Sequence, residues 1–175
     1  MIAGPGLPRT LHLAVTGGLR LALPGLLAAA LGGCGSGLPA PIAGLEGPLA
    51  AVAPSRSPSL AGRWLALIGE RNGREQVLLI DVERRLPVPL SGLNRPDALP
   101  ISVSVDAAGD RLAVVRQIED RTELVLHRRG LGGVERIAMQ PAGVPRRVAL
   151  RADGRELAVE VSRDGRWQID LIAVP

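Results

Sequence analysis

The sequence predicts an all-β fold made of about three antiparallel blades of the kind found in a β-propeller, here a partial one. The first observation is a repeated phrase, Gly-x-x-Leu-Ala followed by polar turn residues, which begins at Gly62, Gly109 and Gly154. Its spacings of 47 and 45 residues are typical of one stacked supersecondary unit per repeat. The second observation is the alternation of apolar and polar residues at 101–106, which indicates a strand with one buried face.

Turn-forming residues separate the predicted strands. Asn72-Gly73 and Asp164-Gly165 favour two-residue hairpin turns, because both central residues of a type I′ turn take positive φ. The glycines that we assign to turns as structural residues are Gly62, Gly73, Gly109, Gly154 and Gly165.

The repeats are expected at about 60–98, 99–144 and 145–175, with up to four strands in each. Every second strand starts at the repeated leucine, and every third strand starts about eleven residues later. We predict first strands at 101–105 and 147–151, fourth strands at 86–90 and 134–139, and burial on both faces for 167–174. The segment 54–58 is a poor strand because it contains two prolines. Ten strands result, with one missing at each end. Residues 49–53 are apolar enough to supply the missing fourth strand of the third repeat, and no helix is expected after Cys34.

Residues 1–33 are interpreted as a lipoprotein signal peptide. A basic start precedes an apolar run at 21–31, which is shorter than the ~20 residues needed to cross a membrane. Leu31-Gly32-Gly33-Cys34 resembles the lipobox of bacterial lipoproteins. This resemblance makes Cys34 the lipidation site, which carries a covalent diacylglycerol, and residues 34–59 a lipidated flexible tether. It implies a membrane-anchored, periplasm-facing protein, with the outer membrane favoured by glycine at position 35. The alternative is an ordinary secretory signal with a chance cysteine.

The composition argues against nucleic-acid binding, metal binding and catalysis. Trp64 and Trp167, the only aromatic residues of the stacking type, are interpreted as packing residues, and the chain therefore lacks the stacking groups of nucleic-acid readers. His127 is the only histidine after the signal and is interpreted as a surface or hydrogen-bonded residue. A zinc site needs three or four ligands, and a nucleophile needs a base and an orienting group. We therefore expect no enzyme activity, cofactor or metal.

Arginine pairs are the candidate interaction residues. They are Arg84 and Arg85, Arg128 and Arg129, and Arg146 and Arg147. Two pairs follow third strands and one leads into the third repeat. Gathered on one rim, they would form a basic patch for phosphate-bearing headgroups or an acidic partner. The alternative is a solvated face on which acidic residues such as Glu83 and Glu135 are interspersed.

Residues 101–129 and 147–172 resemble the WD-like propeller repeats of the periplasmic TolB family. Arg151-Ala152-Asp153-Gly154 corresponds to the first turn of that repeat, Leu157-Ala158-Val159 to its second strand and Asp164-Gly165 to its second turn. The resemblance implies a non-catalytic protein–protein interaction module that binds an envelope protein in envelope maintenance or assembly. The alternative is a small-ligand or glycan-binding sensor domain.

The family's propeller has six blades, whereas three are predicted here. Closed propellers typically need at least four blades. A homodimer with two-fold symmetry would supply six blades. The alternatives are a self-sufficient pack of three blades and the remnant of a longer gene.

Overall fold

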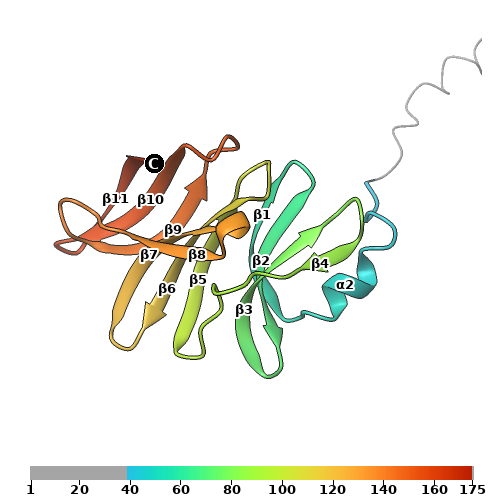
Figure 1. Cartoon of the computed structure of the whole chain (residues 1–175). Coiled ribbons are helices and arrows are strands. Elements are labelled where there is room, and N and C mark those ends of the chain that lie inside the picture. Colours follow the sequence, from blue (N-terminus) through green and yellow to red (C-terminus); the bar gives the residue numbers. More distant parts are fainter. Residues whose placement is uncertain (1–38, 175) are drawn as a thin grey trace, which may run out of the picture. The chain divides into compact units, whose positions relative to one another are not determined.

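Three antiparallel sheets, which we call blades 1, 2 and 3, form the folded unit that begins at Ile42 (Figure 1). The structure is a computed structural model, and it describes residues 39–174. Blade 1 consists of β1 (Ser55–Ala61), β2 (Trp64–Arg71), β3 (Arg74–Asp81) and β4 (Leu86–Val88). Blade 2 consists of β5 (Ala98–Val105), β6 (Arg111–Ile118), β7 (Arg121–Arg128) and β8 (Gly133–Ile137). Blade 3 consists of β9 (Val144–Leu150), β10 (Glu156–Arg163) and β11 (Arg166–Ala173). The predicted all-β class is confirmed.

Hairpin turns join the strands where the sequence predicted them. Arg71 pairs with Arg74, so that Asn72-Gly73 forms a two-residue loop with φ of 55° and 72°. Asp164-Gly165 repeats this geometry with φ of 50° and 73°. All five glycines assigned to turns have positive φ, which an L-residue adopts only at a cost.

The segment expected to be a poor strand is the first strand of blade 1, so the described residues contain eleven strands rather than ten. β1 pairs with β2, but its register shifts between Arg56 and Ser59. Pro58 lies in this irregularity, and β1 is an edge strand. A proline is tolerated at such a position because no ladder bond needs its missing N–H.

Residues 49–53 do not form the missing fourth strand of blade 3. They belong to α2 (Glu46–Ala50) and to the turn after it. The prediction that no helix follows Cys34 is therefore also wrong, because α2 and a second short helix, η1 (Arg129–Leu131), both lie after it. Leu45, Leu49 and Val52 pack against blade 1 at helical spacing. The range 34–59, for which a tether was predicted, therefore contains α2, which covers one face of blade 1, and the first five residues of β1.

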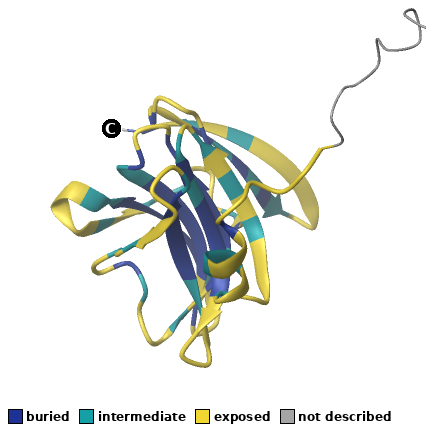
Figure 2. Cartoon of the chain, turned by 90° about the vertical axis from the view of Figure 1, so that its right-hand side faces the viewer, coloured by how far each residue is buried: buried dark blue, intermediate teal, exposed yellow. Residues whose placement is uncertain are grey.

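Apolar side chains fill the space between neighbouring blades, and exposed residues occupy the turns and sheet edges (Figure 2). Between blades 1 and 2 the largest fully buried side chains include Ile68, Leu79 and Leu112. Between blades 2 and 3 they include Leu126 and Leu157. The far face of blade 1 is covered by the α2 segment.

A ladder of serine hydroxyls also links the first strands of adjacent blades. Each hydroxyl accepts a hydrogen bond from a backbone N–H of the next blade. The acceptors and donors are Ser57 and Val103 at 3.3 Å, Ser59 and Val105 at 3.1 Å, Ser102 and Val148 at 3.2 Å, and Ser104 and Leu150 at 2.8 Å. These bonds satisfy amides that the hairpin ladder leaves free, and they set the distance between blades.

The repeated glycines have a second role, which is to receive a side chain from the preceding blade. A Cβ on Gly109 would lie 2.4 Å from the ring of Trp64. At the corresponding position of the next blade, a Cβ on Gly154 would lie 3.0 Å from the side chain of Arg111. Arg111 also donates a hydrogen bond of 2.8 Å to the carbonyl of Gly154. Glycine is therefore required here for packing as well as for the turn.

Candidate interaction surface

The outward face of blade 3 carries exposed apolar side chains on β11. Ile169 is 67% exposed and Leu171 is 82% exposed. Sequence alternation predicted burial on both faces of this strand, and the structure corrects that prediction for the outward face. The opposite face packs on blade 2 through Leu157 and Val159 of β10.

The same positions are buried in the other two blades. The equivalent leucines, each paired with the alanine of the repeated Leu-Ala, are Leu79, Leu126 and Leu171. The branched residues two positions earlier are Val77, Leu124 and Ile169. In blades 1 and 2 these side chains are at most 2% exposed because the next blade covers them. Blade 3 therefore has the apolar pattern of an interface between blades without a covering blade among the described residues.

Arginines and a tryptophan border this apolar strip. The guanidinium of Arg146 lies 5.1 Å from the ring centroid of Trp167, a side chain that is 52% exposed. Arg147 pairs in register with Glu160, and Glu160 pairs with Ile169, so these three residues share the outward face. The strip is thus apolar along β11 and charged toward β9.

Within residues 39–174 the outer edge of β11 is open, because blade 3 has the strand order β11-β10-β9 and none of these residues forms a strand beyond β11. β4 and β8 occupy the corresponding place in blades 1 and 2. A hollow of about 660 Å³ runs along this edge, between residues 169–173 and the segment at Ala138 and Gln140. The main chain of β11 therefore borders a space next to a free sheet edge.

The first predicted arginine pair lies in the turn after β3 and contacts its own blade. Arg84 lies 3.8 Å from the carboxylate of Asp81, which is 2% exposed. Asp81 also accepts hydrogen bonds from the backbone N–H groups of Glu83 and Arg84, both at 3.1 Å. The side chain of Arg85 lies against Gly44. Both arginines thus contribute to the fold of the turn.

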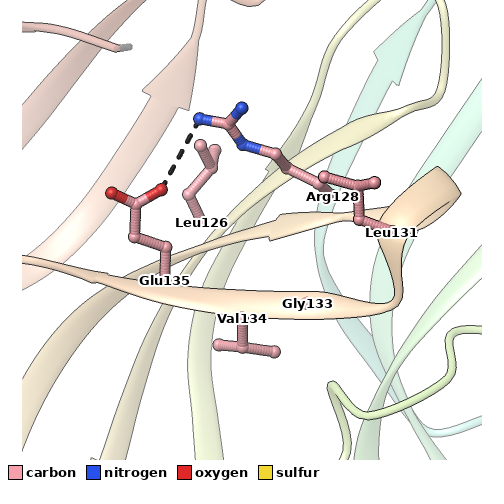
Figure 3. A pocket seen from close by; sticks show the side chains of 6 residues that line it. All are labelled: Leu126, Arg128, Leu131, Gly133, Val134 and Glu135. Atoms are coloured by element: carbon pink, nitrogen blue, oxygen red, sulfur yellow. Dashed lines mark ion pairs between the residues drawn. The ribbon is translucent and has the colours of Figure 1, made fainter.

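The second pair lies at the end of β7, with Arg128 as the last residue of the strand and Arg129 as the first residue of η1. Arg128 forms an ion pair of 3.5 Å with Glu135, and Figure 3 shows the two side chains on the same side of β8, with Val134 on the other. They line a hollow of about 310 Å³. Arg129 lies 4.7 Å from the ring centroid of Trp64, and Arg63 lies 4.8 Å from it. Trp64 is buried, as its interpretation as a packing residue requires.

The three arginine pairs do not form one patch. The first pair lies in the turn after β3 and the second at the end of β7, whereas Arg146 and Arg147 lie within β9. Acidic residues are interspersed near the first two pairs. The exposed strip of Trp167, Ile169 and Leu171 was not predicted, because the alternation of apolar and polar residues does not show which apolar face lacks a neighbour. A comparison of the repeats at these positions was the available signal.

His127 is buried rather than at the surface. Its side chain is fully buried, and Nδ1 lies 3.1 Å from the carbonyl oxygen of Gly133. Burial lowers the pKa of the imidazole, against a smaller opposing effect of this hydrogen bond. Nε2 has no hydrogen-bond partner within the part of the chain that the structure describes.

Residues 39–174 contain neither a metal-binding cluster nor a membrane-spanning helix. No group of three or more His, Cys, Asp or Glu side chains there is close enough to hold a metal ion. No helix in this range is long and apolar enough to cross a membrane. Cys34 and the expected signal peptide lie outside the described residues.

The fold is similar to that of TolB from Acinetobacter baumannii, known from a crystal structure. The TM-score is 0.54 at 16% sequence identity, and the match covers 70% of this chain and 30% of the TolB chain. The likeness shows a TolB-like β-propeller fold, and this chain spans less than a third of the length of the protein that it matches. No protein-family model matches the sequence, and no curated protein matches it.

Proposed function

We propose that this protein is a lipid-anchored, non-catalytic protein–protein interaction module that faces the periplasm from a bacterial membrane, with the outer membrane favoured. It would act in envelope maintenance or assembly by binding an envelope protein. The observation that carries this proposal is the open edge of β11 beside a hollow of about 660 Å³. The lipobox-like segment at Cys34 and the TolB-like fold support the location.

The edge of β11 has the properties of a strand-accepting site. An edge strand presents unpaired N–H and C=O groups, to which an extended segment of a partner can add as a further strand. Residues 166–173 contain no proline, a residue that often protects such edges. The carboxylate of Asp170 is held by Arg163 at 2.9 Å. Arg163 therefore compensates the negative charge of Asp170, the one acidic residue of β11.

Site-specific photo-crosslinking in intact membranes tests the partner. A photoreactive amino acid at Ala173, which is exposed at the end of β11, should give a discrete adduct with one envelope protein, identified by mass spectrometry. The same group at Arg121, an exposed residue at the start of β7 in blade 2, is the matched control. An absence of adduct at position 173, or the same adducts at both positions, would contradict the proposal.

The anchor is tested separately with Cys34→Ser. The natural chain should incorporate a labelled fatty acid and sediment with membranes, and the variant should lose both properties. Such a result would also distinguish a lipobox from an ordinary secretory signal. Incorporation of label by the variant would exclude Cys34 as the attachment site.

A second candidate function, a sensor for a small ligand, is favoured by one cleft. A hollow of about 270 Å³ lies between the α2 segment and blade 1, and its lining includes Val52, Leu78 and Ile80 together with Arg71 and Arg85. An apolar site with a guanidinium suits an amphiphilic carboxylate. Such a ligand should raise the midpoint of thermal unfolding in a saturable manner, and Arg85→Ala should remove the effect. No shift with medium-chain fatty acids would dismiss this candidate.

A further inference from the structure

We propose that the outward face of blade 3 docks onto the same face of a second copy of this chain. We call this surface the blade 3 face, and its residues are Arg146, Arg147, Ala149, Ala158, Glu160, Trp167, Ile169 and Leu171. The inference goes beyond the proposed function, which uses the edge of β11 and a different protein.

The first argument is continuity with the interfaces between blades. Ile169 and Leu171 have the positions that are buried between blades 1 and 2 and again between blades 2 and 3. Repeat arrays bury such faces against a neighbour, and an uncovered end normally carries polar residues. The blade 3 face keeps its apolar residues instead, so we infer that a flat sheet surface covers it.

The second argument concerns what that surface is. A further blade of the same type would present backbone N–H groups to serine hydroxyls, as Val148 and Leu150 do at the preceding interface. On the blade 3 face, the positions of Ser102 and Ser104 are occupied by Arg147 and Ala149, which offer no hydroxyl acceptor. A blade added in series would therefore leave two amides without acceptors. The blade 3 face of a second copy presents no such amides.

The third argument excludes packing of blade 3 on blade 1 of a second copy, the arrangement of a six-bladed ring. The α2 segment already covers the corresponding face of blade 1, and Leu45 is 6% exposed there. The carbonyl of Val52 also accepts a hydrogen bond of 3.2 Å from the N–H of Glu70. A six-bladed ring could form only if the α2 segment were displaced from blade 1. A two-fold contact between blade 3 faces leaves it in place and closes the assembly at two copies.

Charge on the blade 3 face is compatible with self-docking. Arg147 and Glu160 lie side by side on adjacent strands, so each copy brings one cation and one anion to the same part of the face. A two-fold axis allows each charge to meet its opposite in the second copy. Arg146 makes a cation–π contact with Trp167 of its own chain and keeps its positive charge.

The size of the face predicts a weak dimer. Three strands of seven or eight residues cover roughly 26 Å by 14 Å, from the usual rise per residue and strand spacing. This footprint of about 400 Å² per copy is half of the ~800 Å² of a stable interface. Association is therefore expected in the micromolar range. Attachment of both copies to one membrane would raise their effective concentration and favour the pair.

The test is the solution mass of the full chain by light scattering, from about 1 µM to about 200 µM, a range that spans the affinity expected for an interface of this size. All samples carry Cys34→Ser so that no acyl chain drives association. The mass should rise from one copy to two across this range. Leu171→Asp should weaken the dimer at least tenfold. Leu131→Asp is the matched control, because Leu131 is 80% exposed but lies in η1, away from blade 3.

Two results would overturn the inference. One is a mass of a single copy at every concentration for the unsubstituted face. The other is equal dimerisation of the Leu171→Asp and Leu131→Asp chains. Thermal unfolding of the Leu171→Asp chain should match that of the monomeric parent, which excludes misfolding as the cause. If no dimer forms but position 173 still crosslinks to an envelope protein, the dimer is refuted and the proposed function stands. If the dimer forms but position 173 gives no such adduct, the proposed function is refuted and the dimer stands.

Discussion

Replacement of Gly109 by alanine should destabilise this protein much more than replacement of Gly165. Both glycines have positive φ, 68° and 73°, so the added Cβ strains the backbone equally, by about 1–2 kcal/mol. At Gly165 nothing lies within 4 Å of the new methyl group, whereas at Gly109 it would lie 2.4 Å from the ring of Trp64. Such overpacking costs about 1–3 kcal/mol more. We expect a loss of about 2–5 kcal/mol for Gly109→Ala and about 1–2 kcal/mol for Gly165→Ala.

Urea unfolding followed by circular dichroism measures these free energies. A double-mutant cycle with Trp64→Ala isolates the clash, because removal of the ring leaves only the backbone strain. In the Trp64→Ala background, Gly109→Ala should cost no more than Gly165→Ala does in the parent. Equal costs for the two glycines in the parent, or a cost at Gly109 that does not depend on Trp64, would refute the packing role assigned to the repeated glycine.

Ser104→Ala should lower the free energy of unfolding by about 1–3 kcal/mol, because the buried N–H of Leu150 loses its acceptor at 2.8 Å. Ala149→Ser, at the equivalent but exposed position of blade 3, should change the free energy of unfolding by less than about 0.5 kcal/mol. Equal changes for the two variants in urea unfolding would argue against the serine ladder. Burial lowers the pKa of His127, so the unfolded chain binds a proton at a higher pH than the folded chain does. The free energy of unfolding should therefore fall as the pH drops below about 6.5, until the pH reaches the pKa of the folded state. The slope should be at most ~1.4 kcal/mol per pH unit. His127→Gln should flatten the pH dependence between about 6.5 and 5, a window above the titration of ordinary carboxyl groups, and an unchanged slope would show that another group causes it.

Strands and hairpins were predictable because their signals are local. Alternation along β5 and β10 and the dipeptides Asn72-Gly73 and Asp164-Gly165 depend only on neighbouring residues, and the structure confirms them. The repeat of the Gly-x-x-Leu-Ala phrase likewise predicted three blades before any packing was known. Local backbone preference is sufficient for such elements.

Other elements depended on what lies beside them. Residues 49–53 have a composition that suits a strand, but blade 1 provides an apolar face that Leu45, Leu49 and Val52 cover from a helical turn. β1 forms in spite of Pro58 because its edge position needs no ladder bond there. The arginine pairs were candidates for one basic patch or for a solvated face, yet the pairing of β9 places Arg147 on the blade 3 face, and the register shift beside it brings Arg146 over Trp167.

The sequence by itself thus determined the all-β class, the number of blades and the turns, because these follow from periodicity and short motifs. The lipid anchor at Cys34 stays a prediction. Only the tertiary structure decided that Leu79 and Leu126 are buried and Leu171 is exposed, although the three leucines occupy the same place in their repeats. The physical reason is that burial is a property of the neighbour, since a side chain leaves water only where another surface covers it. The α2 segment covers one end of the array, and the blade 3 face remains for a partner.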